Sequence, residues 1–134
     1  NMNGMFRNAG YYSSNFALDL SNFDTSNVTG MEYMFTNTGY SNPNFTLDVS
    51  NFDTSKVTSM DRMFGGTGYN STKLRTSIAI RNPNTTYYEM FKDVATKSGS
   101  QIVVNYTEET KTLVDEMIKT KSSNSNVVKG VRVD

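Results

Sequence analysis

The 134-residue sequence contains no cysteine, no histidine and no tryptophan, and it has only two prolines. Disulfides, the usual Cys/His metal sites, and the Ser-His-Asp and Cys-His catalytic arrangements are therefore excluded. Neither sign of charge dominates, because 13 Lys and Arg residues balance 13 Asp and Glu residues. We therefore do not expect nucleic acid or an anionic membrane as a partner.

Long apolar runs are also missing. The chain has no stretch long enough for a membrane-spanning helix, and its N-terminus lacks the charged and apolar regions of a signal peptide. It also lacks glycine-rich phosphate loops of the Walker or dinucleotide-binding type. The length suits one domain with a modest core, without insertion into a membrane.

A 29-residue repeat organises the first half of the chain. Two dipeptides recur at this interval, Met-Phe at residues 5, 34 and 63 and Gly-Tyr at residues 10, 39 and 68. Such a period is typical of solenoids, in which each unit buries its apolar face against its neighbours. Met2 takes the repeat position of Met31 and Met60, so we expect the chain to begin inside a repeat of a longer protein.

Each repeat is predicted to contain a helical half and an extended half. Met31, Met34 and Phe35 have the i, i+3, i+4 spacing of one helix face and follow a segment, 29–32, with capping-box spacing. Apolar and polar residues alternate over 45–49, as expected for a strand with one buried face. Stacked repeats would form a parallel sheet on one side and short helices on the other.

The pattern departs from the strict period in the third repeat and changes after Gly99. We predict an array of about three repeats over residues 1–98, the third divergent, and a β-α-β cap over 99–134, together forming one structural domain. A helix is predicted to open at Thr107 between the last two strands. The predicted fold class is an α/β solenoid, with parallel strands near 17–22, 46–51, 77–81, 101–105 and 127–133.

The segment Leu18–Thr29 and its copy Leu47–Thr58, each followed by a Met-x-x-Met-Phe motif, resemble the repeat of BspA-like surface proteins. This is a divergent leucine-rich-repeat family of bacterial surface proteins, and the matches cover about residues 1–69. The resemblance implies a leucine-rich-repeat-like solenoid at the cell surface and, in several relatives, adhesion to host or extracellular-matrix molecules. The chain differs from the family in lacking the usual Cys after Met-Phe and in its longer repeat.

The first candidate site lies on the outward positions of the predicted sheet, at Asp19, Ser21, Asp48 and Ser50. Stacked strands would bring the carboxylates of Asp19 and Asp48 within about 5 Å of each other, where like charges repel. Backbone hydrogen bonds, a basic group or a calcium ion are the alternatives that would neutralise them. A pair of carboxylates could also serve a glycosidase.

The second candidate site is the row formed by Tyr11, Tyr40 and Tyr69. Exposed aromatic side chains in a row can stack on sugars or anchor a protein partner. The structural alternative is that these rings cover the sheet edge and pack against Phe16 and Phe45.

The sequence therefore predicts a non-catalytic recognition or adhesion domain of a secreted or cell-surface bacterial protein. The expected partner is a host or extracellular-matrix protein or glycan, and the expected state is a monomeric domain within a longer chain. No cofactor is expected, with calcium at Asp19 and Asp48 as the open alternative. A passive spacer is the alternative function, and a carboxylate-based glycosidase is the third.

Overall fold

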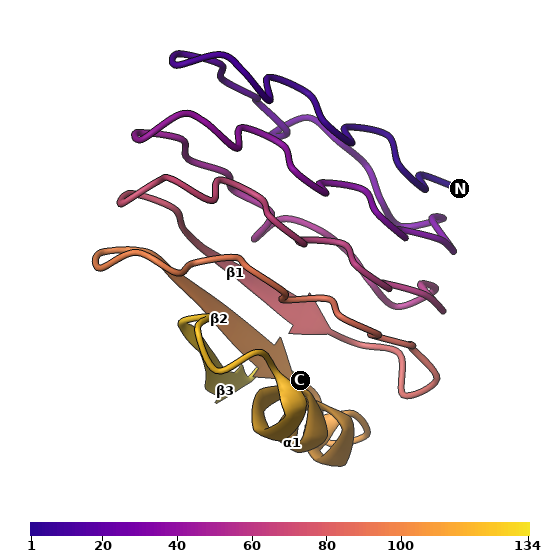
Figure 1. Ribbon diagram of the computed structural model, residues 1–134. Coiled ribbons are helices and arrows are strands. Elements are labelled where there is room, and N and C mark those ends of the chain that lie inside the picture. Colours follow the sequence, from indigo (N-terminus) through magenta and orange to yellow (C-terminus); the bar gives the residue numbers. More distant parts are fainter.

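The computed structural model describes residues 1–134. Its regular elements, in chain order, are β1 (Arg75–Ile80), β2 (Gln101–Tyr106), α1 (Lys111–Thr120) and β3 (Val127–Arg132) (Figure 1). The strands form one parallel sheet in the order β1-β2-β3. Before β1 the chain runs back and forth, and successive segments lie side by side (Figure 1).

The predicted fold class, a leucine-rich-repeat-like α/β solenoid, is wrong. The sheet has three strands instead of the predicted five, and α1 is the only α-helix. Residues 17–22 and 46–51 form no strand, and the segment of Met31, Met34 and Phe35, where a helix was expected, forms turns. Strands do occur at the other three predicted positions. The division of the chain at residues 98 and 99 stays a prediction.

Left-handed backbone conformations explain why the predicted short helices do not form. Tyr33 and Asn37 have φ angles of 57°, and Arg62, which is equivalent to Tyr33, has a φ of 55°. A right-handed helix cannot pass through such residues, because their carbonyl groups point in the wrong direction. The i, i+3, i+4 pattern of apolar residues therefore arises here from a series of tight turns.

The backbone amides of these turns alternate between local and distant acceptors. The N–H of Met34 donates to the carbonyl of Met31 at 3.3 Å, whereas the N–H of Phe35 donates to the carbonyl of Met63 at 2.9 Å. The N–H of Tyr33 likewise reaches Asp61 in the next segment at 3.0 Å. Buried backbone groups are thus satisfied without a helix or a ladder of strands.

Side chains replace ladder hydrogen bonds in the segments wrongly predicted as strands. The N–H of Ser50 donates to Oδ1 of Asp48 at 2.9 Å, and the N–H of Val49 donates to Oγ1 of Thr76 at 3.0 Å. Asp and Asn side chains that accept from the amide two residues on form local turns. The Asp-x-Ser motif therefore turns the chain at the position where an extended strand was expected.

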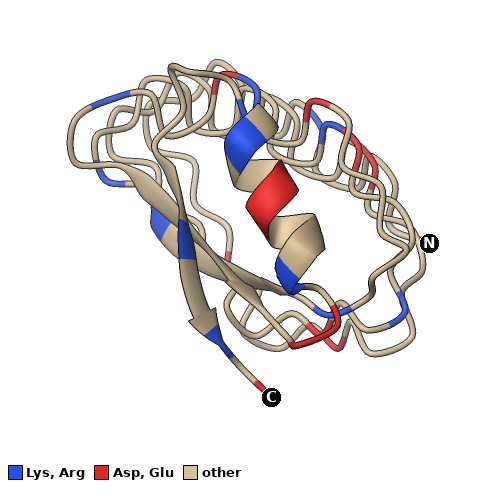
Figure 2. Ribbon diagram, turned by 90° about the horizontal axis from the view of Figure 1, so that it is seen from below, with Lys and Arg blue, Asp and Glu red and all other residues tan.

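The second half of the chain forms the sheet and its flanking helix. β1 pairs with β2 from Arg75 opposite Gln101, and β2 pairs with β3 from Ile102 opposite Val127. Figure 2 shows α1 lying across the end of the molecule beside the sheet. No helix of the structure has the length and apolar character needed to cross a bilayer.

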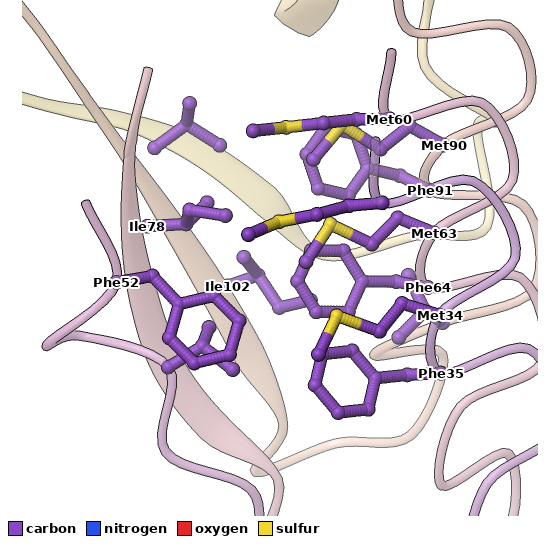
Figure 3. Packing of buried hydrophobic residues seen from close by; sticks show 14 of the residues in the cluster. Met34, Phe35, Phe52, Met60, Met63, Phe64, Ile78, Met90, Phe91 and Ile102 are labelled. Carbon is purple, nitrogen blue, oxygen red and sulfur yellow. The ribbon is translucent and has the colours of Figure 1, made fainter. Parts of the chain in front are cut away.

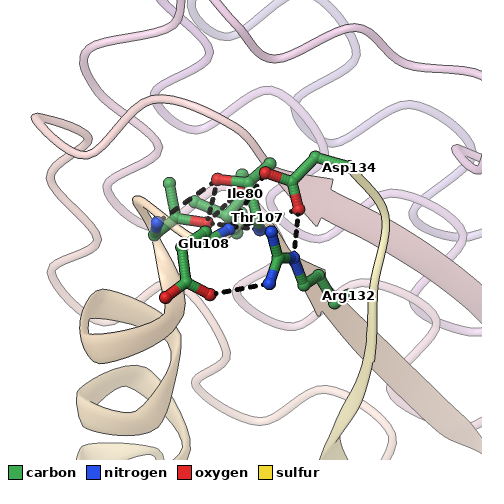
Figure 4. A network of polar contacts seen from close by, with 6 residues as sticks. Ile80, Thr107, Glu108, Arg132 and Asp134 are labelled. Carbon is green, nitrogen blue, oxygen red and sulfur yellow. Dashed lines mark hydrogen bonds and ion pairs between the residues drawn. The ribbon is translucent and has the colours of Figure 1, made fainter.

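Helix α1 begins later than predicted because two threonines hold the preceding loop. The N–H of Thr107 donates to Oγ1 of Thr110 at 2.9 Å, and that hydroxyl donates to the carbonyl of Ile80 at 2.6 Å (Figure 4). Nearby, Arg132 joins Asp134 at 2.7 Å and Glu108 at 3.0 Å. These contacts attach the start of the β2-to-β3 connection to the end of β1 and to the C-terminal end of β3.

One hydrophobic cluster of 25 buried residues fills the interior. Figure 3 shows its rows of phenylalanine and methionine side chains facing the apolar side of the sheet. The rings of Phe35 and Phe64 stack with centroids 5.8 Å apart, and those of Phe64 and Phe91 are 6.0 Å apart. Because equivalent residues of successive segments contact each other, the apolar positions of the sequence repeat form the core.

Candidate functional site

The structure brings together the three tyrosines that the sequence singles out. The rings of Tyr11 and Tyr40 stack with centroids 4.7 Å apart, and those of Tyr40 and Tyr69 are 4.9 Å apart, in both cases nearly parallel. Tyr12 meets Tyr11 edge-on, and Nζ of Lys97 lies 5.0 Å from the centroid of Tyr69. The stack therefore presents mainly ring edges and hydroxyl groups to the outside.

The tyrosine stack is a partly buried feature of the surface. Desolvation raises the pKa of the Tyr40 hydroxyl, and the flanking hydroxyls of Tyr11 and Tyr69 raise it further. Phe16 and Phe45 stack on each other in a separate pair, with centroids 6.3 Å apart. The tyrosine rings thus have one another as aromatic neighbours, and their binding role stays a prediction.

A second row of side chains, which the sequence analysis missed, alternates cations and aromatic rings. The guanidinium of Arg7 lies 4.8 Å from the ring centroid of Tyr33, and that of Arg62 lies 5.5 Å from the same ring and 5.1 Å from Tyr88. Such cation–π contacts are favourable, most strongly where water is excluded. The sequence contained one indication of this row. Tyr33 and Arg62 are 29 residues apart, so they hold equivalent positions in neighbouring repeats.

A hollow of about 390 Å³ lies between the two rows. Asn37 donates from its side-chain amide to Asn8 at 3.3 Å, and at the equivalent position of the next segment stands Gly66, which has no side chain. An added Cβ at Gly66 would lie 2.2 Å from Oδ1 of Asn37, so the glycine makes room for the Asn37 side chain at the edge of the hollow. The lining residues share a polar or aromatic character and include Tyr11, Tyr40, Arg62, Glu89, Lys92 and Asp93.

Glu89 is the centre of the charges in this hollow. Its carboxylate lies 3.4 Å from Arg62 and 3.2 Å from Lys92. Hydrogen bonding by Tyr88, followed by that of Lys92, lowers the pKa of Glu89. Because solvent-exposed ion pairs contribute little to stability, a ligand could rearrange these charges at small cost.

The first candidate site is divided between two shallow depressions. Asp19, Ser21 and Asp48 line one of them together. Asp48 and Ser50 line another, with Arg75 of β1. Neither depression shares a residue with the hollow beside the tyrosines. The outward Asp and Ser positions and the tyrosine row therefore do not form one continuous site.

The carboxylates of Asp19 and Asp48, for which calcium was considered, accept hydrogen bonds from nearby serines. Oδ1 of Asp19 accepts the N–H of Ser21 at 2.9 Å, and Oδ1 of Asp48 accepts the N–H and the hydroxyl of Ser50 at 2.9 and 2.6 Å. No group of three or more Asp or Glu residues is placed to hold a metal ion. Local hydrogen bonds thus stabilise these charges.

Replacing Ser50 by alanine is expected to raise the pKa of Asp48, because the Ser50 hydroxyl is the main cause of its lowered value. Ser21→Ala should change the pKa of Asp19 less, because the backbone amide is the main cause there and alanine retains it. NMR titration of the side-chain carboxyl carbons measures both changes. Equal changes in the two variants would contradict this account.

Acid is expected to destabilise the fold through the same motif. The pKa values of Asp19, Asp24, Asp48 and Asp53 are all lowered by hydrogen bonds from the serine two residues on. Their contribution to stability is therefore complete above the unfolded-state value of about 3.9 and is lost as pH falls through the lower folded-state values. Thermal midpoints measured by circular dichroism from pH 7 to pH 2 should stay level and then fall below about pH 4.

The family of the chain follows from comparison with known proteins. Residues 1–106 match the family described as "Mycoplasma protein of unknown function, DUF285". The match includes all the repeat segments, β1 and β2, and it ends before α1. Comparisons with curated proteins and with solved structures gave no match. Because the family model covers well over half of the sequence, the chain belongs to this family of Mycoplasma proteins of unknown function.

Proposed function

We propose that the chain is a non-catalytic recognition domain of a bacterial cell-surface or secreted protein, which binds a host or extracellular partner. The observation that carries the proposal is the hollow between the tyrosine stack and the Arg62, Glu89 and Lys92 cluster. Tyr and Arg are the residue types that most often dominate binding energy at protein interfaces. Here both types line one concave surface outside the core.

The surface location rests on the repeat motif. Leu18–Thr29 and Leu47–Thr58 resemble the repeat of BspA-like surface proteins, and membership of a bacterial family is consistent with that resemblance. The absence of cysteine also suits an oxidising exterior, where free thiols would be oxidised.

The packing of the rings favours a protein over a glycan as the ligand. Sugars bind aromatic residues through open ring faces, but both faces of Tyr40 are covered by Tyr11 and Tyr69. The hollow offers hydroxyls, ring edges and paired charges instead. These groups suit the hydrogen bonds and ion pairs of a polypeptide surface.

The carboxyl groups support a binding role over glycoside hydrolysis. Glycosidases need one carboxylic acid with a raised pKa, which donates a proton to the leaving oxygen. Every carboxyl whose pKa departs from its ordinary value here is lowered, including those of Asp19 and Asp48. These groups favour the ionised form and are poor proton donors at neutral pH.

Binding to a panel of extracellular-matrix proteins and host glycans tests this proposal. Tyr40→Ala and Lys92→Ala remove two walls of the hollow and are each expected to weaken binding by about tenfold or more. Tyr12→Ala is the matched control, because Tyr12 is 90% exposed and does not line the hollow. We expect its affinity to stay within about twofold of the unmodified chain.

Circular dichroism of each variant separates loss of binding from loss of folding. The recognition surface would be supported by saturable binding to a panel protein, if Tyr40→Ala and Lys92→Ala lose this binding and Tyr12→Ala keeps it. No saturable binding to any member of the panel would favour the alternative of a passive spacer. Unchanged affinity in all three variants would place the binding surface elsewhere on the chain.

A further inference from the structure

Backbone donors at the last of the stacked segments have no acceptor. In the interior segments, every second residue donates its N–H to the next segment, as Met60 does to Thr86 at 2.9 Å and Phe64 to Met90 at 3.0 Å. In the segment that follows, the equivalent amides donate no hydrogen bond to any backbone or side-chain group of the chain. These amides, here called the donor row, belong to Tyr87, Glu89, Phe91 and Asp93.

Helix α1 explains why this row is unpaired. Val114 and Met117 are buried in the core cluster, and Figure 2 shows the helix across the end of the molecule. The helix thus covers the apolar end of the core. The carbonyl of Thr110 at its N-terminus accepts within the helix, from Val114 at 2.9 Å, and no hydrogen bond joins a carbonyl of α1 to the donor row.

A hollow of about 250 Å³ separates the donor row from the C-terminal half of α1. Tyr87 and Tyr88 contribute aromatic surface to it, above the buried Met90 and Met117, and Thr120, Lys121 and Ser122 form its helical wall. The hollow therefore combines apolar surface with a neighbouring line of unpaired backbone donors.

We propose that this edge binds a segment of a partner polypeptide. Carbonyl oxygens of the segment accept from the donor row, and an apolar side chain enters the hollow between this row and the C-terminal half of α1. The interior of the protein shows which kind of occupant fits, because each equivalent row pairs with carbonyls of every second residue of a neighbouring segment. Addition of an extended peptide to a free backbone edge is a known recognition mode.

The polarity of the edge supports this occupant. All the unpaired groups of the row are donors with partial positive charge, so they need a line of acceptors at the same spacing. In the interior, carbonyls of every second residue of a neighbouring segment supply these acceptors, as Thr86 does for Met60 and Met90 for Phe64. Any polypeptide backbone supplies such acceptors, whatever its side chains are. The hollow adds selectivity, because it favours an apolar side chain at one position of the bound segment.

Amide hydrogen exchange followed by NMR is the first test, and it needs only the free chain. We expect the amides of Tyr87, Glu89 and Asp93 to exchange at least about tenfold faster than those of Met31, Tyr33 and Asn37, their counterparts in an interior segment. Equal protection in the two sets would overturn the proposal, because it would mean that the row is already paired.

A phage-displayed library of random ten-residue peptides is the second test. Thr120→Trp should fill the hollow, because Thr120 is exposed and forms part of its wall. Thr112→Trp is the matched control, because it places the same side chain at an exposed position of α1 outside the hollow. Selected peptides should bind the unmodified chain and Thr112→Trp equally and should bind Thr120→Trp at least about tenfold more weakly.

The bound peptide should slow exchange of the donor-row amides. A selected peptide that leaves these amides unprotected, or that binds both tryptophan variants equally, would overturn the proposal. Protection that grows with protein concentration in the absence of peptide would overturn it in favour of a second copy of the chain. Tyr40→Ala should not affect this binding, so its outcome is independent of the function proposed for the tyrosine surface.

Discussion

Replacing Gly99 by alanine is expected to lower the free energy of unfolding by about 3 kcal/mol or more. Gly99 has a φ of 98°, which L-residues rarely adopt, and an added Cβ would lie 2.4 Å from the carbonyl oxygen of Thr72. The contact is with backbone, so no rotation of a side chain can relieve it. Backbone strain and overpacking therefore act together at the turn that leads into β2.

Gly4→Ala is the control for this prediction. Gly4 has a φ of 67° but has no atom near the position of an added Cβ. Its replacement should cost only the strain of the left-handed conformation, about 1 kcal/mol. Urea unfolding followed by circular dichroism measures both variants. Similar losses of stability would show that the contact with Thr72 is relieved by movement of the loop.

The second large effect is expected from Phe64→Ala, which should cost about 4 kcal/mol of stability. Phe64 is fully buried and stacks on Phe35 on one side and on Phe91 on the other. Its removal leaves a cavity in the middle of the row, and two rings lose a stacked neighbour. The stacked segments are joined through this row, so the loss should appear as destabilisation of the whole fold.

Phe6→Ala is the matched control because Phe6 lies at the end of the same row. It stacks on Phe35 at 5.7 Å but remains partly exposed. Urea denaturation should show less than half of the loss caused by Phe64→Ala, because water can fill the space at the end of the row. A larger loss in Phe6→Ala would contradict the central position assigned to Phe64.

The 29-residue period identified which residues meet, but the secondary structure inferred from it was partly wrong. The spacing of Tyr11, Tyr40 and Tyr69 predicted a row, and their rings do stack. The spacing of Met31, Met34 and Phe35 predicted a helix that does not form. A hydrophobic period reports which side chains share a face, and a series of tight turns produces the same spacing as a helix turn.

The features missed by the sequence analysis depend on contacts between segments. Arg7 and Tyr33 are not at equivalent repeat positions, so no period predicted their cation–π contact at 4.8 Å. The hollow beside Tyr40 was missed because its walls come from segments far apart in the sequence, from Tyr11 to Asp93. The donor row at Tyr87 was missed because the sequence shows a backbone amide but does not show whether an acceptor faces it.

The sequence by itself determined the residues that form the core and the row of tyrosines, because both depend on spacing along the chain. The same spacing predicted five strands, of which the structure forms three. Three other features were decided only by the tertiary structure. The turns of the repeats contain residues with left-handed backbone angles. Serine groups donate hydrogen bonds to Asp19 and Asp48, and α1 leaves the donor row unpaired. The physical reason is that backbone conformation and hydrogen-bond pairing depend on the neighbouring segment. That neighbour lies nearly 30 residues away, beyond the reach of any local pattern.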